Sequence, residues 1–228
     1  MTVYILDLFG TFVFAVSGAF RAVKYELDIL GVTVLAIITG MGGGMVRDML
    51  LGVTPVSALQ NETYFFVCIA AAVLVFFAAP HIARGWQFFV VADALGLGIF
   101  TAVGALKGYQ AGLGIVGVSL AGSLTATGGG LIRDMLVREI PLVISRDVYA
   151  SAALAGGLVL YGSGKIGASP GLQMTLAVTV ATGLRLLAYR YGVQLPRVRA
   201  LPENPAALAM KSGWRPRLFH GFRKKPPV

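Results

Sequence analysis

The stretch that decides the fold is GGGMVRDML at residues 42–50, because it returns nearly unchanged as GGGLIRDML at residues 128–136. The offset of 86 residues extends in both directions: residues 7–55 align with 93–141 without a gap, and 18 of these 49 positions are identical. Such self-similarity indicates a duplicated structural unit. Outside the motif, the identical pairs include Asp7/Asp93, Gly10/Gly96, Phe14/Phe100, Gly18/Gly104, Gly31/Gly117, Thr39/Thr125 and Pro55/Pro141.

The composition of the 228 residues places both copies in a membrane. They are 57% hydrophobic and 13% charged, with a mean hydropathy of +0.79. A soluble domain carries roughly 25% charged residues, so this chain has too few charges to cover a surface in water. The same values exclude an intrinsically disordered chain. The 30 glycines fit membrane helices, where glycine permits close packing.

Seven hydrophobic runs are long enough to be considered as spans, since a spanning helix needs about 20 mostly apolar residues. We therefore predict an all-α membrane protein with seven transmembrane helices. The predicted spans are residues 3–22, 29–50, 64–80, 87–106, 113–136, 148–163 and 170–189.

Each copy of the repeat contains three predicted spans, and an odd number of spans inverts the second copy relative to the first. Inverted repeats are common in proteins that move solutes, with the working site between the two copies. We assign residues 1–86 to the first three-helix repeat, 87–166 to the inverted second repeat, 167–189 to the seventh helix and 190–228 to a basic tail.

The tail sets the predicted orientation. Residues 190–228 hold nine Lys or Arg against one acid, Glu203, which accounts for +8 of the net charge of +9. Basic segments beside a span are typical of the cytoplasmic side near anionic lipid, and we expect lipid and not nucleic acid as the partner. The prediction is a multi-pass protein of the inner (plasma) membrane, with its N-terminus outside and its C-terminus in the cytoplasm.

The glycine triplets are the first candidate functional feature. Each glycine costs roughly 1 kcal/mol relative to alanine inside a helix. Gly42, Gly43, Gly44 and Gly128, Gly129, Gly130 are therefore predicted to kink or unwind spans 2 and 5. Carbonyl groups freed in this way must face protein or water and can bind cations. The alternative is that the glycines only allow close helix packing.

The charges that follow each triplet are the second feature. Arg47, Asp48, Arg133 and Asp134 lie at or near membrane depth, where charges usually face a partner or a cavity. Adjacent residues on a helix do not face each other, so we expect neither Arg to pair simply with the next Asp. Pairing between repeats, carboxylates facing a cation, and a position at the membrane interface all remain open.

Several other polar residues are candidates for a path. We interpret Asp7, near the start of the first span, as a helix-capping residue. Asp93 lies deeper in its span and is a candidate for the path. Hydroxyl residues such as Ser17 and Thr101 line the expected path, although such groups more often bond their own helix. Aromatic residues near span ends are predicted to form interfacial belts. These are Tyr64, Phe65, Phe66, Trp86, Phe88 and Phe89.

The seven spans, the inverted 3+3 repeat and both GGGxxRD copies resemble the prokaryotic TRIC proteins, the trimeric intracellular cation channels. The resemblance covers about residues 4–190. It implies a homotrimer with a pore in each subunit, helices kinked at both glycine triplets, and passage of potassium and sodium. Some bacterial relatives have been regarded as glycine transporters, so the resemblance leaves channel and carrier open.

Two functions follow as hypotheses. A monovalent cation channel would be gated by the glycine-kinked helices, with a cation held at Asp134 and Gly128. A secondary transporter of a small zwitterion such as glycine would use Arg for the carboxylate and Asp for the ammonium group. We expect no enzyme and no cofactor, because the spans lack a catalytic set and Cys68, His81 and His220 are scattered.

Overall fold

The structure is a computed structural model that describes residues 2–78, 85–145 and 148–193. The described residues all belong to one compact unit, Met1–Leu195. Nearly all of the predicted basic tail therefore lies outside the described residues. His81 and His220 also lie outside the described residues.

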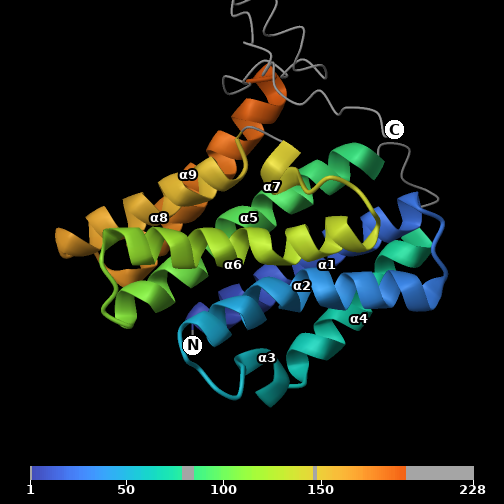
Figure 1. Cartoon of the computed structure of the whole chain (residues 1–228), viewed down its shortest axis with the longest axis horizontal. Coiled ribbons are helices and arrows are strands. Elements are labelled where there is room, and N and C mark those ends of the chain that lie inside the picture. Colours follow the sequence, from blue (N-terminus) through green and yellow to red (C-terminus); the bar gives the residue numbers. More distant parts are fainter. Residues whose placement is uncertain (1, 79–84, 146–147, 194–228) are drawn as a thin grey trace, which may run out of the picture. The chain divides into compact units, whose positions relative to one another are not determined.

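The described part of the chain forms nine α-helices, drawn in Figure 1. Two of them, α3 and α7, have four residues each and were not predicted. The helices are α1 (Thr2–Lys24), α2 (Ile29–Leu50), α3 (Ser57–Gln60), α4 (Thr63–Ala78), α5 (Gly85–Gln110), α6 (Ile115–Leu136), α7 (Leu142–Ser145), α8 (Ala150–Lys165) and α9 (Pro170–Tyr191).

Five helices of the described chain are long and apolar enough to cross a membrane: α1, α2, α5, α6 and α9. The third predicted span of each repeat corresponds to a shorter helix, α4 or α8, of 16 residues. Sixteen residues rise about 24 Å, less than the roughly 30 Å of a bilayer core. Seven spans therefore remain a prediction for these two helices, and α4 is described only as far as Ala78.

Local chemistry fixes the ends of the long helices. Asp28 precedes α2, and its side chain accepts a hydrogen bond from the Gly31 backbone nitrogen at 2.7 Å. Ser169 caps α9 in the same way, followed by Pro170 at the first helical position. At the other end of α9, Gly192 adopts a left-handed conformation with φ of 63°, which glycine tolerates best.

Four helices form the centre of the molecule. α1 packs on α2 and α5, α5 packs on α6, and α2 lies along α6 (Figure 1). α4 covers α1 and α2, while α8 and α9 cover α5 and α6. The core of the first repeat is made largely of small side chains, such as Ala15, Ala36 and Ala72. Small residues let these helices approach closely.

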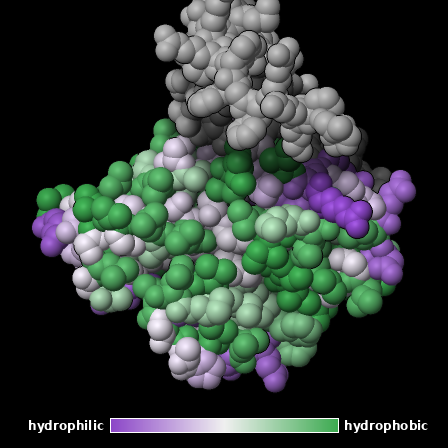
Figure 2. Space-filling view, viewed as in Figure 1, coloured by the Kyte–Doolittle hydropathy of each residue, from purple (hydrophilic) through white to green (hydrophobic). Residues whose placement is uncertain are grey.

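The outer surface is strongly apolar. Figure 2 shows hydrophobic residues over most of the visible face of the described helices. A protein surface in water rarely has so large an apolar area, whereas lipid chains make it favourable. Exposed apolar side chains include Leu30, Phe66, Phe77, Val116, Leu158 and Leu187.

Candidate functional site

The two glycine triplets meet where α2 lies along α6. A Cβ atom added to Gly43 would stand 2.1 Å from the carbonyl oxygen of Thr125, and one added to Gly129 would stand 2.2 Å from that of Thr39. Neither position therefore accepts a side chain without moving the opposite backbone. This seam fits the alternative interpretation from the sequence, in which the glycines allow close helix packing. The glycine of each helix lies against a carbonyl oxygen of the other, that of Thr39 or Thr125.

Both helices continue through their triplets without interruption. α2 is helical throughout Ile29–Leu50 and α6 throughout Ile115–Leu136. The unwinding expected from three successive glycines is therefore not observed, because the tight contact across the seam stabilises both helices. A bend without unwinding stays a prediction.

The first polar cluster lies near the N-terminal end of α1 and consists of Asp7, Arg47, Asp48, Tyr64 and Lys107. Arg47 donates from Nε to Asp48 Oδ1 at 2.8 Å, and its two Nη atoms reach both oxygens of Asp7 at 3.5 and 3.4 Å. Tyr64 donates its hydroxyl to Asp7 Oδ2 at 3.2 Å. These contacts join α1, α2 and α4 of the first repeat.

Lys107 brings the second repeat into this cluster. Its Nζ atom on α5 lies 3.4 Å from Asp48 Oδ1 on α2. The other carboxylate oxygen of Asp48 accepts from the backbone nitrogen of Ser57, at the start of α3, at 2.9 Å. The short helix α3 thus holds the end of α2 in place.

A cavity of about 390 Å³ opens onto the first cluster. A much smaller cavity, of about 10 Å³, lies next to it and reaches Gly40, Gly44 and Phe100. The two share Asp7, Ser57 and Tyr64 in their walls, so polar groups continue from the larger cavity inward. The larger cavity is also lined by Val3, Tyr4, Asn61 and Lys107.

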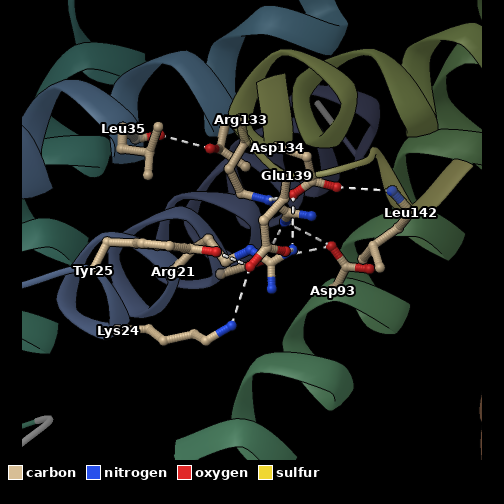
Figure 3. Close-up of polar contacts among 11 residues, drawn as sticks. Arg21, Lys24, Tyr25, Leu35, Asp93, Arg133, Asp134, Glu139 and Leu142 are labelled. Atoms are coloured by element: carbon tan, nitrogen blue, oxygen red, sulfur yellow. Dashed lines mark hydrogen bonds and ion pairs between the residues drawn. The ribbon is translucent and has the colours of Figure 1, made fainter. Parts of the chain in front are cut away.

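The second polar cluster lies toward the other end of α1 and contains Arg21, Asp93, Arg133 and Asp134 (Figure 3). Ser17 also belongs to it through its contact with Arg133. Arg133 donates from Nε to Asp134 Oδ1 at 2.9 Å, and its Nη1 atom donates to Asp93 Oδ1 at 2.8 Å and to Ser17 Oγ at 2.7 Å. Arg21 donates to Asp134 Oδ1 at 3.3 Å. Since α1 rises about 1.5 Å per residue, the clusters lie about 21 Å apart along it.

Further contacts close the second cluster. Glu139 accepts from Arg21, Tyr25 and, at 3.1 Å, from Lys24. Asp134 Oδ2 accepts from the backbone nitrogen of Leu142, at the start of α7, at 2.9 Å. The start of α7 therefore holds the end of α6 through Asp134, just as the start of α3 holds the end of α2 through Asp48.

An aromatic ring covers the second cluster. The guanidinium carbons of Arg21 and Arg133 each lie 4.9 Å from the ring centroid of Phe89, which is 3% exposed. A second such contact involves Tyr149, with the guanidinium carbon of Arg185 4.8 Å from its ring centroid. Aromatic faces stabilise cations in this geometry.

The structure corrects the prediction that the motif arginines do not pair with the next aspartate. Arg47 and Arg133 each do so through Nε. The prediction considered only the directions of the Cβ atoms, whereas the long arginine side chain turns Nε to one carboxylate and leaves Nη atoms for another. Pairing between repeats is confirmed by the contacts of Arg21 with Asp134 and of Lys107 with Asp48.

Two other interpretations also change. Asp7 is not a helix cap, because its carboxylate is buried against Arg47 and Tyr64. The belt prediction is wrong for Tyr64 and Phe89, which are 6% and 3% exposed and belong to the clusters. It agrees with the exposure of Phe65, Phe66 and Phe88, and the side chain of Trp86 lies outside what the structure describes.

The predicted hydroxyl path is mostly used locally. Thr101 donates to the carbonyl of Leu97 on its own helix at 2.7 Å, and Thr39 does the same to Leu35 at 2.6 Å. Ser17 instead reaches across to α5, accepting from Arg133 and donating to Asp93 at 3.4 Å.

Sequence reasoning missed Arg21, Lys107, Tyr64, Tyr149 and Phe89 as site residues. The repeat holds the missing signal. Arg21 and Lys107 occupy equivalent positions, 86 residues apart, and conserve a positive charge. Tyr64 and Tyr149 also occupy equivalent positions, but they are 85 residues apart, as are the starts of α3 and α7. The second repeat is one residue shorter after Pro141.

The cation site at Asp134 and Gly128 stays a prediction. Both carboxylate oxygens of Asp134 already accept hydrogen bonds, from Arg21, Arg133 and Leu142. Oδ1 takes two of these hydrogen bonds and Oδ2 takes one, so the remaining acceptor capacity for a cation lies on Oδ2.

The fold and clusters define an α-helical membrane protein with a duplicated sequence motif and two buried ion-pair clusters. A family profile described as "Glycine transporter" matches residues 4–80 and 90–164. A UPF0126 membrane protein of Vibrio cholerae is 38% identical over 196 residues, covering 85% of this chain and 81% of the relative. The UPF0126 inner membrane protein YadS of Escherichia coli K12 is 37% identical over 209 residues, covering 90% and 99%.

Solved structures agree. A TRIC trimeric intracellular cation channel orthologue from Rhodobacter sphaeroides superposes with a TM-score of 0.81 at 35% identity, covering 84% of this chain and 99% of that one. A prokaryotic TRIC channel in 0.5 M KCl gives 0.81 at 32% identity, covering 86% and 99%. This chain belongs to the family that contains the profile's glycine transporters, the UPF0126 membrane proteins and the prokaryotic TRIC channels.

Proposed function

We propose that this protein is a cation channel that conducts potassium and sodium through a path inside each subunit. One structural observation carries the proposal: a cavity of about 390 Å³, lined by residues of α1, α3, α4 and α5, leads onto Asp7. The similarity to solved TRIC cation channels, at a TM-score of 0.81, supports the same assignment. The path runs from this cavity toward the second cluster along α1, α2, α5 and α6.

The polar clusters suit weak selection between monovalent cations. In the first cluster, Asp7 and Asp48 are balanced by Arg47 and Lys107. A neutral cluster has no strong field to retain an ion, so a passing cation exchanges part of its hydration shell for carboxylate and hydroxyl oxygens and then leaves. Such a site favours cations in general over one particular size.

Gating in this proposal comes from movement of α2 against α6. The seam between them contains glycines and few interlocking side chains, so one helix can shift without repacking a core. The clusters lie at the ends of these helices and resist the shift through their ion pairs. In this proposal, α2 can shift along α6 and open the path only when ion pairs in the clusters exchange partners.

We further infer a homotrimer in the inner membrane, with lipid as its surroundings. The trimer is supported by the description of the Rhodobacter sphaeroides orthologue as a trimeric channel. The excess of Lys and Arg in residues 190–228 supports a cytoplasmic C-terminus. In this orientation the first cluster faces outward and the second faces the cytoplasm.

The second candidate function is transport of a small zwitterion such as glycine. It is favoured by the description of the matching family profile. The cavity also presents both charge signs, with the carboxylate of Asp7 and the ammonium group of Lys107 in its wall. Inverted repeats serve carriers as well as channels.

Planar-bilayer recording of the purified protein in a potassium chloride gradient tests the proposal. Discrete current steps that reverse near the potassium potential support a cation channel. Asp134→Asn, which weakens the second cluster, then alters conductance or open time, whereas Asp28→Asn at the exposed cap of α2 does not. Absence of steps together with saturable uptake of labelled glycine into vesicles rejects the channel in favour of the carrier.

A further inference from the structure

We propose that the paired rings of Phe14 and Phe100 form an apolar septum that closes the ion path midway between the two clusters. The inference rests on the proposed channel function. It concerns residues that belong to neither polar cluster, and it assigns them the control of permeation.

The spacing along α1 and α5 places both rings between charged groups. On α1, Asp7, Phe14 and Arg21 follow at intervals of seven residues, and on α5 the same intervals separate Asp93, Phe100 and Lys107. Seven residues make about two helical turns, or roughly 10 Å. Each helix therefore presents one charge to each cluster and a phenylalanine halfway between them on nearly the same face.

The two rings meet in the interior. Their centroids are 5.0 Å apart with an interplanar angle of 53°, and Phe14 and Phe100 are 0% and 1% exposed. Phe100 also lines the small inner cavity below the first cluster. The two adjoining cavities that share Asp7 therefore end at the ring of Phe100.

Each ring rests on a glycine of the opposite helix. A Cβ atom added to Gly10 would stand 2.8 Å from the ring of Phe100, and one added to Gly96 would stand 2.9 Å from the ring of Phe14. These glycines have no side chain that could fill the space if a ring were removed. Shortening either phenylalanine therefore opens space down to the bare backbone.

A dry aromatic contact of this kind blocks ions. A cation that enters it loses its hydration shell and finds no oxygen ligand in return, and narrow apolar passages also exclude water. The rings must part before a continuous file of water joins the two clusters. The septum thus holds the path shut in the conformation described here.

The test is planar-bilayer recording of full-length wild type, Phe14→Ala, Phe100→Ala, Phe100→Leu and Phe100→Asn in symmetric potassium chloride. Phe9→Ala on α1 and Phe88→Ala on α5 are matched controls, because both side chains are more than half exposed. We expect the alanine and asparagine variants to raise open probability at least severalfold, the leucine variant to fall between, and the controls to match wild type.

The outcomes separate the septum from the channel itself. If wild type conducts and Phe100→Ala and Phe100→Asn, eluting like wild type in size-exclusion chromatography, show unchanged open probability, the septum is wrong. If an alanine variant does not elute normally, Phe100→Leu decides, since leucine keeps the interior apolar but removes the aromatic ring that meets Phe14: unchanged gating rejects the septum. Silence of wild type and all variants overturns the channel proposal, whereas a silent wild type with conducting variants supports both.

Discussion

The two polar clusters are built from equivalent residues of the two repeats but have different surroundings. Asp7, Arg47 and Asp48 in the first correspond to Asp93, Arg133 and Asp134 in the second. Both keep the Arg–Asp pairs, yet the first opens onto a cavity of about 390 Å³ and the second is covered by an aromatic ring. The duplicated ion pairs join the helices of each repeat, and the surrounding positions differ between the two clusters.

Two substitutions account for much of the difference. Position 3 is valine, whereas its equivalent 86 residues later is Phe89. Arg21 is 1% exposed in its side chain and contacts both Asp134 and Glu139, whereas Lys107 is 25% exposed and contacts Asp48. Breaking a buried ion pair destabilises a protein much more than breaking an exposed one. We therefore expect equivalent substitutions in the two clusters to cause unequal losses of stability.

The largest expected effect is the loss of a motif arginine. Arg133→Ala leaves Asp93 and Asp134 buried without their shared cation, which we expect to cost about 3–5 kcal/mol. That corresponds to a melting temperature lower by roughly 10 °C. Arg47→Ala costs less, because water in the adjacent cavity can solvate Asp7. Thermal unfolding in detergent checks this, and equal losses would contradict the difference between the clusters.

The second pair of variants compares the contacts between repeats. Arg21→Met removes a buried cation from two carboxylates, and we expect a cost of about 2–4 kcal/mol. Lys107→Met costs about 0–1 kcal/mol, since Lys107 is itself 25% exposed and Asp48 keeps its hydrogen bonds with Arg47 and the Ser57 backbone. Repeating the Lys107 measurement at high salt sharpens the result, because salt should erase its small effect and leave that of Arg21. The opposite ranking would show that exposure does not set these energies.

The third test exchanges the residues that open and close the clusters. Phe89→Val removes the ring from two guanidinium groups and should cost about 1–2 kcal/mol. Val3→Phe should narrow the cavity and slow acetylation of the Lys107 amine, followed by mass spectrometry at that site. Lys165, outside the cavity, serves as the internal control. Unchanged labelling of Lys107 would mean that position 3 does not control access.

The smallest expected effect concerns the third glycine of each triplet. Replacing glycine by alanine within a helix stabilises it by roughly 1 kcal/mol where space permits. An alanine Cβ at position 44 would meet Arg47 at 3.7 Å, an ordinary contact, whereas one at position 130 would meet Tyr149 Oη at 3.1 Å. Gly44→Ala should therefore stabilise slightly and Gly130→Ala should be neutral or worse. Calorimetry of both variants in one detergent resolves the difference, and a stabilising Gly130→Ala would show that Tyr149 moves freely.

The sequence by itself determined a large part of this protein. Hydrophobic runs located the long helices, with α2 placed at residues 29–50 as observed. The offset of 86 residues revealed the duplication, and the motif pointed to the arginines and aspartates of both clusters. These features could be predicted because apolar length and internal repetition are properties of neighbouring residues along the chain.

Only the tertiary structure decided how the duplicated parts are used. It packed Gly43 and Gly129 against opposing carbonyl groups where the sequence suggested unwinding. It turned each motif arginine onto two carboxylates, brought Arg21 and Lys107 across the repeat boundary, and buried Tyr64 and Phe89. These outcomes depend on contacts between residues 40 to 116 positions apart, set by how helices of opposite orientation approach, which no local pattern records.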